Sequence, residues 1–150
     1  MRTSEIGSAA DGGYIMAGYT DSYGAGLYDL YLVKTDSEGT AEWSRTYGGT
    51  GRDYGNSLVQ TSDGGYLAAG YTLSYGAGGD DVWLVRTDAD GNLEWQTTYG
   101  GSASDVGYAV AKTDDGGYAV AGHTLSSGAG LHDAWLIRLA PESAFGRPRA

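Results

Sequence analysis

Five aspartates stand at two recurring positions of this chain, 52 residues apart. Asp29, Asp81 and Asp133 each precede an apolar run, and Asp53 and Asp105 each follow a glycine-rich loop. A carboxylate beside such a loop can accept backbone N–H groups and hold one loop conformation, or it can help to bind a cation. Because these aspartates recur with the repeat, we interpret them as structural anchors.

The turn that contains Asp88, Asp90 and Asn92 resembles the opening of a calcium-binding loop. Such a loop also needs a further acidic ligand and a glutamate at its twelfth position, and neither follows here. The corresponding turn one repeat earlier reads TDSEGT. We therefore predict neither a metal ion nor a cofactor.

Tyrosines in the long loops form a second group of candidate functional residues. Tyrosine rings can stack on sugars, and nearby polar groups can bind hydroxyls; the alternative is that the rings only seal the loops against one another. Arg52 and His132 depart from the residues at the same positions of the other repeats, which makes them better candidates for a ligand. The candidate ligand-binding set is Tyr23, Tyr28, Arg52, Tyr54, Tyr75, Asp80 and His132.

Catalysis has little support in the sequence. The two histidines are His123, where the other repeats have tyrosine, and His132 in the last long loop. Ser126, Ser127 and Asp133 lie nearby but do not form a recognisable nucleophile motif. We assign no catalytic residue and predict a non-enzymatic protein, with a carbohydrate-active enzyme as one alternative because acidic residues are plentiful.

The charge of the chain limits its partners. Nineteen acidic residues against nine basic residues give a net charge of -10, which would repel a phosphate backbone and excludes nucleic acid as an expected partner. No stretch approaches the roughly 18 apolar residues of a membrane helix, and residues 1–14 lack the apolar run of a signal peptide. The chain contains no cysteine, so its compartment stays open.

The positions above follow an internal repeat. The tetrapeptide DGGY occurs at Asp11, Asp63 and Asp115, and each copy opens a similar stretch. We treat residues 1–150 as one repeat domain, with a partial unit over residues 1–10, units over 11–62, 63–114 and 115–140, and a tail or degraded outer strand over 141–150. Such a period is typical of architectures built from stacked repeats.

Each unit predicts four short antiparallel strands and no helix. Around the second unit the strands are expected at residues 56–61, 66–72, 81–87 and 93–99, separated by clusters of Gly, Asp and Ser. The third strand of each set is a continuous apolar run (LYLV, VWLV, AWLI), which suits a strand covered on both faces. We therefore expect the sheets to stack face to face. The Ala-Gly pairs of the second strand would let two sheets approach closely, and Trp43 and Trp95 would pack in the wider outer part.

The string DGGY...AGYT...SYGAG...D.YLVKTD..G...W..TYGG resembles the repeats of a large group of bacterial and archaeal β-propeller proteins. The resemblance covers nearly the whole chain. It implies a propeller of four-stranded blades and, because such proteins are often secreted or surface-located, an extracellular or cell-surface location. It implies no particular activity.

Three repeats are fewer than the four to eight blades that usually close a propeller. We expect three blades per chain and a six-bladed ring as a homodimer; a β-trefoil monomer, which also has three four-stranded units, is the alternative. The expected function is a scaffold or recognition module. A lectin-like propeller with a glycan or protein ligand, and a fragment of a longer array with no evolved ligand, also remain open.

Overall fold

The computed structural model describes residues 1–142. Over this range the chain is all-β, and none of these residues forms a helix long and apolar enough to cross a membrane. The strands are β1 (Arg2–Ser8), β2 (Tyr14–Thr20), β3 (Asp29–Thr35), β4 (Ala41–Tyr47), β5 (Asp53–Gln60), β6 (Tyr66–Thr72), β7 (Asp81–Thr87), β8 (Leu93–Tyr99), β9 (Asp105–Lys112), β10 (Tyr118–Thr124) and β11 (Asp133–Leu139).

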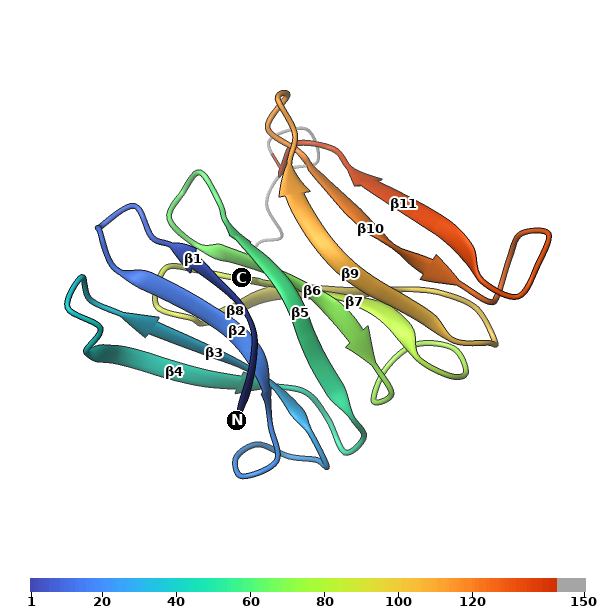
Figure 1. Cartoon of the computed structure of the whole chain (residues 1–150), viewed down its shortest axis with the longest axis horizontal. Coiled ribbons are helices and arrows are strands. Elements are labelled where there is room, and N and C mark those ends of the chain that lie inside the picture. Colours follow the sequence, from blue (N-terminus) through green and yellow to red (C-terminus); the bar gives the residue numbers. More distant parts are fainter. Residues whose placement is uncertain (143–150) are drawn as a thin grey trace.

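The strands form three separate antiparallel sheets, each a simple meander (Figure 1). The first sheet has the order β1-β2-β3-β4, the second β5-β6-β7-β8, and the third β9-β10-β11. A trefoil would join strands of all three units in one barrel, and within residues 1–142 the sheets do not do so. A counterpart of β4 and β8 in the third unit, which the sequence placed in the tail with Phe145 or Arg147 replacing the tryptophan, would lie outside the described residues.

The predicted strands agree closely with those of the second sheet. β6, β7 and β8 have the bounds expected from the sequence, whereas β5 begins at Asp53, three residues before the expected start. The early start comes from a β-bulge: the pairing of β5 with β6 shifts register between Gly55 and Ser57 and then continues to Asp53. The DGGY motif, at which a sequence unit begins, lies at the turn between the first two strands of each sheet. Each sheet therefore combines the last strand of one sequence unit with the strands of the next.

Two apolar cores hold the three sheets face to face. The core between the first and second sheets contains Ile15, Leu32 and Trp83, and the core between the second and third contains Leu67, Leu84 and Val120. All seven residues of β7 are buried, because the second sheet is covered on both sides. Trp43 and Trp95 are partly buried at the margins of the two cores.

The small residues of the second strand act in two different ways, which corrects part of the sequence prediction. Ala69 is buried in the core between two sheets. A Cβ on Gly70, however, would lie 1.8 Å from the carbonyl oxygen of Tyr54 in the same sheet, so the missing side chain accommodates the β-bulge. The backbone of Gly70 does approach the neighbouring sheet, because its carbonyl oxygen lies 2.8 Å from the position that a Cβ on Gly107 would occupy. The first and second sheets approach in the same way at Gly55, where a Cβ would lie 2.8 Å from Leu30 and 3.1 Å from the carbonyl oxygen of Gly18.

Candidate functional site

The long loops of all three sheets gather at one end of the molecule, which we call the loop end (Figure 1). These loops span residues 21–28, 48–52, 73–80, 100–104 and 125–132. They connect the second strand of a sheet to its third, or one sheet to the next. The DGGY turns lie at the opposite end.

The aspartate that begins a sheet ties two of these loops together. Asp53 is buried and accepts hydrogen bonds from the hydroxyl of Thr72, from the hydroxyl of Ser74 (2.6 Å) and from the backbone N–H of Gly49 (2.9 Å). Asp105 accepts the same set from Thr124, Ser126 (2.6 Å) and Gly101 (3.0 Å). Burial alone would raise the pKa of Asp105, but the hydrogen bonds from Ser126, Thr124 and Gly101 outweigh it and lower that pKa below 3.8.

The aspartate that begins the third strand of a sheet anchors the preceding loop. Asp29, Asp81 and Asp133 accept backbone N–H groups of Gly26 (3.1 Å), Ala77 (2.9 Å) and Gly130 (3.1 Å) respectively. Burial, followed by the nearby carboxylates of Asp105 and Asp80, raises the pKa of Asp81. Within residues 1–142 no three acidic, histidine or cysteine side chains come together as a metal site would require.

A row of four tyrosines crosses from the first sheet to the second at the loop end. Tyr54 lies at its centre: its ring is 4.7 Å from that of Tyr19, 5.6 Å from that of Tyr28 and 4.6 Å from that of Tyr71. The contacts to Tyr28 and Tyr71 are stacked, and the contact to Tyr19 is edge-on. All four side chains are half-buried, so the row keeps part of each ring open to solvent.

A cavity of about 340 Å³ opens beside this tyrosine row. Its lining residues are Met1, Arg2, Tyr19, Asp21, Tyr28 and Tyr54. It combines aromatic faces with a guanidinium and a carboxylate, and the Arg52 guanidinium lies 6.0 Å from the centre of the Tyr28 ring. Burial raises the pKa of Tyr71 to about 12, and it also raises the pKa of Tyr54, so both phenols stay protonated at neutral pH and can donate hydrogen bonds.

The structure brings only some of the predicted ligand-binding residues together. Tyr28, Tyr54 and Arg52 lie at the tyrosine row. Tyr23 stacks on Tyr31 and Tyr75 lies against Trp83, so the rings of these two tyrosines pack outside the row.

The other two predicted ligand-binding residues belong to the second and third sheets. The carboxylate of Asp80 accepts a hydrogen bond from Ser104 (2.7 Å). His132 lies edge-on against His123, with ring centres 4.7 Å apart, and His123 in turn lies 5.3 Å from the ring of Tyr108. Both histidines therefore contact other rings.

Sequence reasoning missed Tyr19 and Tyr71 as members of the site. A signal was present, because an aromatic ring follows the Ala-Gly pair of every repeat, at Tyr19, Tyr71 and His123. Tyr19 and Tyr71 lie in strands β2 and β6, whereas the predicted ligand-binding residues lie mostly in the loops. The aromatic side chains of neighbouring strands meet because β5 packs against β2.

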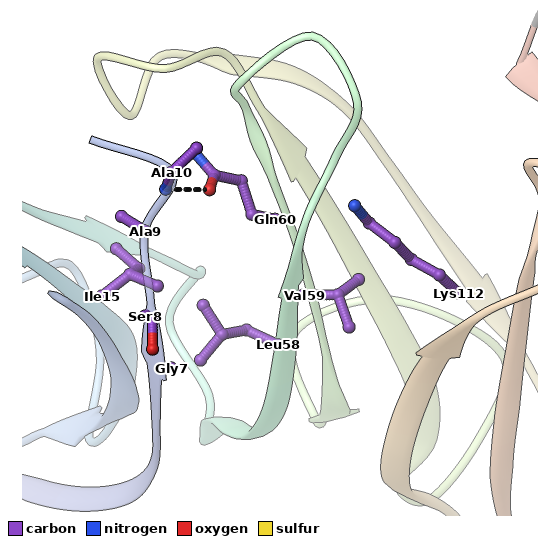
Figure 2. A pocket seen from close by; sticks show the side chains of 9 residues that line it. All are labelled: Gly7, Ser8, Ala9, Ala10, Ile15, Leu58, Val59, Gln60 and Lys112. Atoms are coloured by element: carbon purple, nitrogen blue, oxygen red, sulfur yellow. Dashed lines mark hydrogen bonds between the residues drawn. The ribbon is translucent and has the colours of Figure 1, made fainter. Parts of the chain in front are cut away.

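A second cavity, of about 500 Å³, lies where β1 and β5 diverge toward the DGGY turns (Figure 2). Its lining is mainly small and apolar, with Ile15, Leu58 and Val59 among the larger side chains. Figure 2 shows Lys112 of β9 extending toward Val59. Its lining contains no acidic side chain, so it offers less for a polar ligand than the tyrosine row.

No family model matches this chain. A similar curated protein is the regulatory protein FlaEY of Caulobacter vibrioides, with 29% identity over 165 residues. The similarity covers 94% of this chain but only 17% of that protein's length.

Proposed function

We propose that this chain is a non-enzymatic scaffold that forms half of a six-bladed β-propeller ring and closes the ring with a second copy of itself. One observation carries the proposal. The outer faces at the two ends of the three-sheet stack have side chains at the same repeat positions as those that are buried between the sheets. The resemblance of the repeats to propeller repeats supports the same architecture.

The outer face of the third sheet includes the apolar residues Ala119, Ala121, Ala134 and Leu136, with Arg138 toward its edge. Leu136 is 68% exposed, whereas Leu84, its counterpart in the second sheet, is 0% exposed. The counterparts of the other three are buried in the core between the second and third sheets. The centre of this face is therefore apolar and has no covering sheet in the monomer.

The outer face of the first sheet consists of Ile6, Tyr14, Met16, Tyr31 and Val33. Ile6 is 60% exposed, whereas its counterpart Leu58 is 6% exposed and packs in the core between the first and second sheets. The outer face of the first sheet therefore matches the face of the second sheet that is buried against the first. In a dimer, the third sheet of the other copy would cover it.

Two copies can satisfy both faces at once. If the third sheet of each copy stacks on the first sheet of the other, a twofold axis relates two equivalent interfaces and six sheets surround the centre. Six lies within the usual range of four to eight blades. Apolar faces of this kind are typical of obligate interfaces.

The recurring aspartates and the two histidines contact other parts of the protein, which supports a non-enzymatic role. The recurring aspartates accept loop N–H or hydroxyl groups, and the two histidines lie against each other. FlaEY is named a regulatory protein. A scaffold without catalysis of its own would suit a regulatory role here.

Light scattering on a sizing column, across a range of protein concentrations, tests the proposal. We expect a mass about twice the 15.6 kDa of the chain. Leu136→Asp should give a folded monomer, because a carboxylate in the apolar interface would be costly to desolvate. Leu93→Asp, at an exposed residue of β8, should leave the dimer intact. A compact wild-type monomer at every concentration would contradict the proposal.

Recognition of a carbohydrate is a second candidate function, supported by the tyrosine row and its polar cavity. Aromatic faces stack on sugar rings, and Arg2 and Asp21 could bind hydroxyls. Glycan-array binding that Tyr54→Ala abolishes and Tyr75→Ala preserves would support this function. Absence of binding by the wild-type protein would count against it.

A further inference from the structure

A basic residue recurs in the third strand of each sheet, at Lys34, Arg86 and Arg138. Its environment differs with its place in the stack. Arg86 in the central sheet is 0% exposed, whereas Arg138 in the last sheet has a side chain that is 54% exposed. The difference shows what a following sheet supplies to this position.

Arg86 binds carboxylates from two sheets. In its own sheet it contacts Asp63 (2.9 Å) and Glu94 (3.4 Å). From the third sheet's side, Glu142 accepts hydrogen bonds from Nε (2.6 Å) and Nη2 (3.1 Å). This two-pronged contact is the strongest geometry for an arginine and a carboxylate.

Glu142 occupies a repeated acidic position. It stands 27 residues after the aspartate of its DGGY motif, where the other units have Asp90 and Glu38. Between the second and third sheets, this spacing joins the basic residue of one sheet to the acidic residue of the next unit. Lys34 has its ion pairs with Asp11 (2.8 Å) and Glu42 (2.6 Å) of its own sheet. Lys34 and Asp90, which have the same relation between the first and second sheets, line a common cavity of about 480 Å³.

We propose that Arg138 of one copy pairs with Glu38 of the second copy when the ring closes, an inference that rests on the proposed function. Arg138 contacts Asp115 of its own sheet at 2.6 Å, as Arg86 contacts Asp63, and Glu38 is exposed at the other end of the stack. The twofold ring contains two such pairs. They set the orientation in which the apolar outer faces meet, since opposite charges fix register and like charges disfavour wrong pairings.

Charge reversal tests the pair. Arg138→Glu places two glutamates together at both interfaces, and Glu38→Arg places two arginines together. Each variant alone should therefore dimerise about a hundredfold more weakly than the wild type, with about tenfold arising at each interface. Sedimentation over a dilution series measures the dissociation constants.

Mixing the two variants provides the decisive measurement. In a heterodimer, the glutamate introduced into the first variant faces the arginine introduced into the second, and the unchanged Arg138 faces the unchanged Glu38. Both interfaces are then paired, so an equimolar mixture should dimerise within about threefold of the wild type. Lys112→Glu, which makes the same charge change away from the outer faces, should dimerise like the wild type and should not rescue Glu38→Arg.

Two results would contradict the Arg138–Glu38 pair without contradicting the ring. One is wild-type dimer affinity in both single variants, and the other is a mixture that dimerises as weakly as each variant alone. A wild-type protein that stays monomeric would overturn the proposed function as well. Circular dichroism checks that the variants fold. If either reversal does not fold, Arg138→Gln and Glu38→Gln, which remove the charge without repulsion, should each weaken the dimer about tenfold, and unchanged affinity in both would reject the pair.

Discussion

Asp105 illustrates how a single buried carboxylate organises the loop end. It is 0% exposed and accepts hydrogen bonds from the Thr124 hydroxyl at the end of β10, from the Ser126 hydroxyl of the following loop and from the backbone N–H of Gly101 in another loop. A neutral asparagine presents only one acceptor oxygen, and its amide group would face donors. The negative charge is therefore better suited than an amide to this set of partners.

We predict that Asp105→Asn lowers the free energy of unfolding by about 2–3 kcal/mol at neutral pH, because hydrogen bonds to a charged acceptor are lost while their donors stay buried. The pKa of Asp105 is held below 3.8, so its contribution is present above that pH and is lost as the pH falls through the lowered pKa. The difference between wild type and variant should therefore shrink in acid.

Urea unfolding at neutral pH and at about pH 3, at one fixed protein concentration, measures this difference. Asp21→Asn is the matched control, because Asp21 is exposed and its hydrogen bond is to its neighbour Ser22. An Asp105→Asn variant as stable as this control would contradict the anchoring role.

At the scale of strands, hydrogen bonds cross from sheet to sheet just after the β-bulges of β5 and β9. The backbone N–H of Leu58 in β5 donates to the Glu5 carboxylate of β1 (2.6 Å), and that of Val110 in β9 donates to the Ser57 hydroxyl of β5 (3.1 Å). A side chain of one sheet thus satisfies a backbone group of the next. Such bonds add direction to apolar packing that would otherwise tolerate sliding.

We predict that Ser57→Ala destabilises the packing of the third sheet on the second by about 1–2 kcal/mol, because the N–H of Val110 would stay buried without its acceptor. Hydrogen exchange at β9 measures the effect locally and urea unfolding measures it globally. Ser44→Ala on β4 is the control, since Ser44 is exposed. Equal protection of β9 in both variants would argue that the bond contributes nothing.

These crossing bonds also mark what the sequence could predict and what it could not. Gly and Asp punctuate the chain strongly enough to place β6, β7 and β8, and the apolar composition of β7 indicated burial on both faces. The bulge at Asn56 carries no signal of its own, because pairing register depends on both strands. The grouping of Tyr54 with Tyr19, and the separate packing of Tyr75 on Trp83, depend likewise on how neighbouring sheets meet.

At the scale of the whole molecule, the interface that would close the ring differs from the two inside the chain at one repeated position. Glu5 and Ser57 supply the side-chain acceptor in the first and second sheets, and the corresponding residue of the third sheet is Ala109. The backbone N–H that would meet it belongs to Ile6 of the second copy, by correspondence with Leu58 and Val110. The closing interface therefore lacks a bond that the internal interfaces have.

We predict that Ala109→Ser strengthens the dimer about tenfold, because a serine hydroxyl would supply this acceptor at each of the two interfaces at about 0.5–1 kcal/mol apiece. Ala111→Ser, two residues further along β9, adds the same group where the other repeats have Gly7 and Val59, and it should leave the affinity unchanged. Dissociation constants from dilution series compare the two variants with the wild type. If Ala109→Ser weakened the dimer, or had no effect, the closing interface could not repeat the geometry of the internal ones, since an acceptor at this position is what both internal interfaces use.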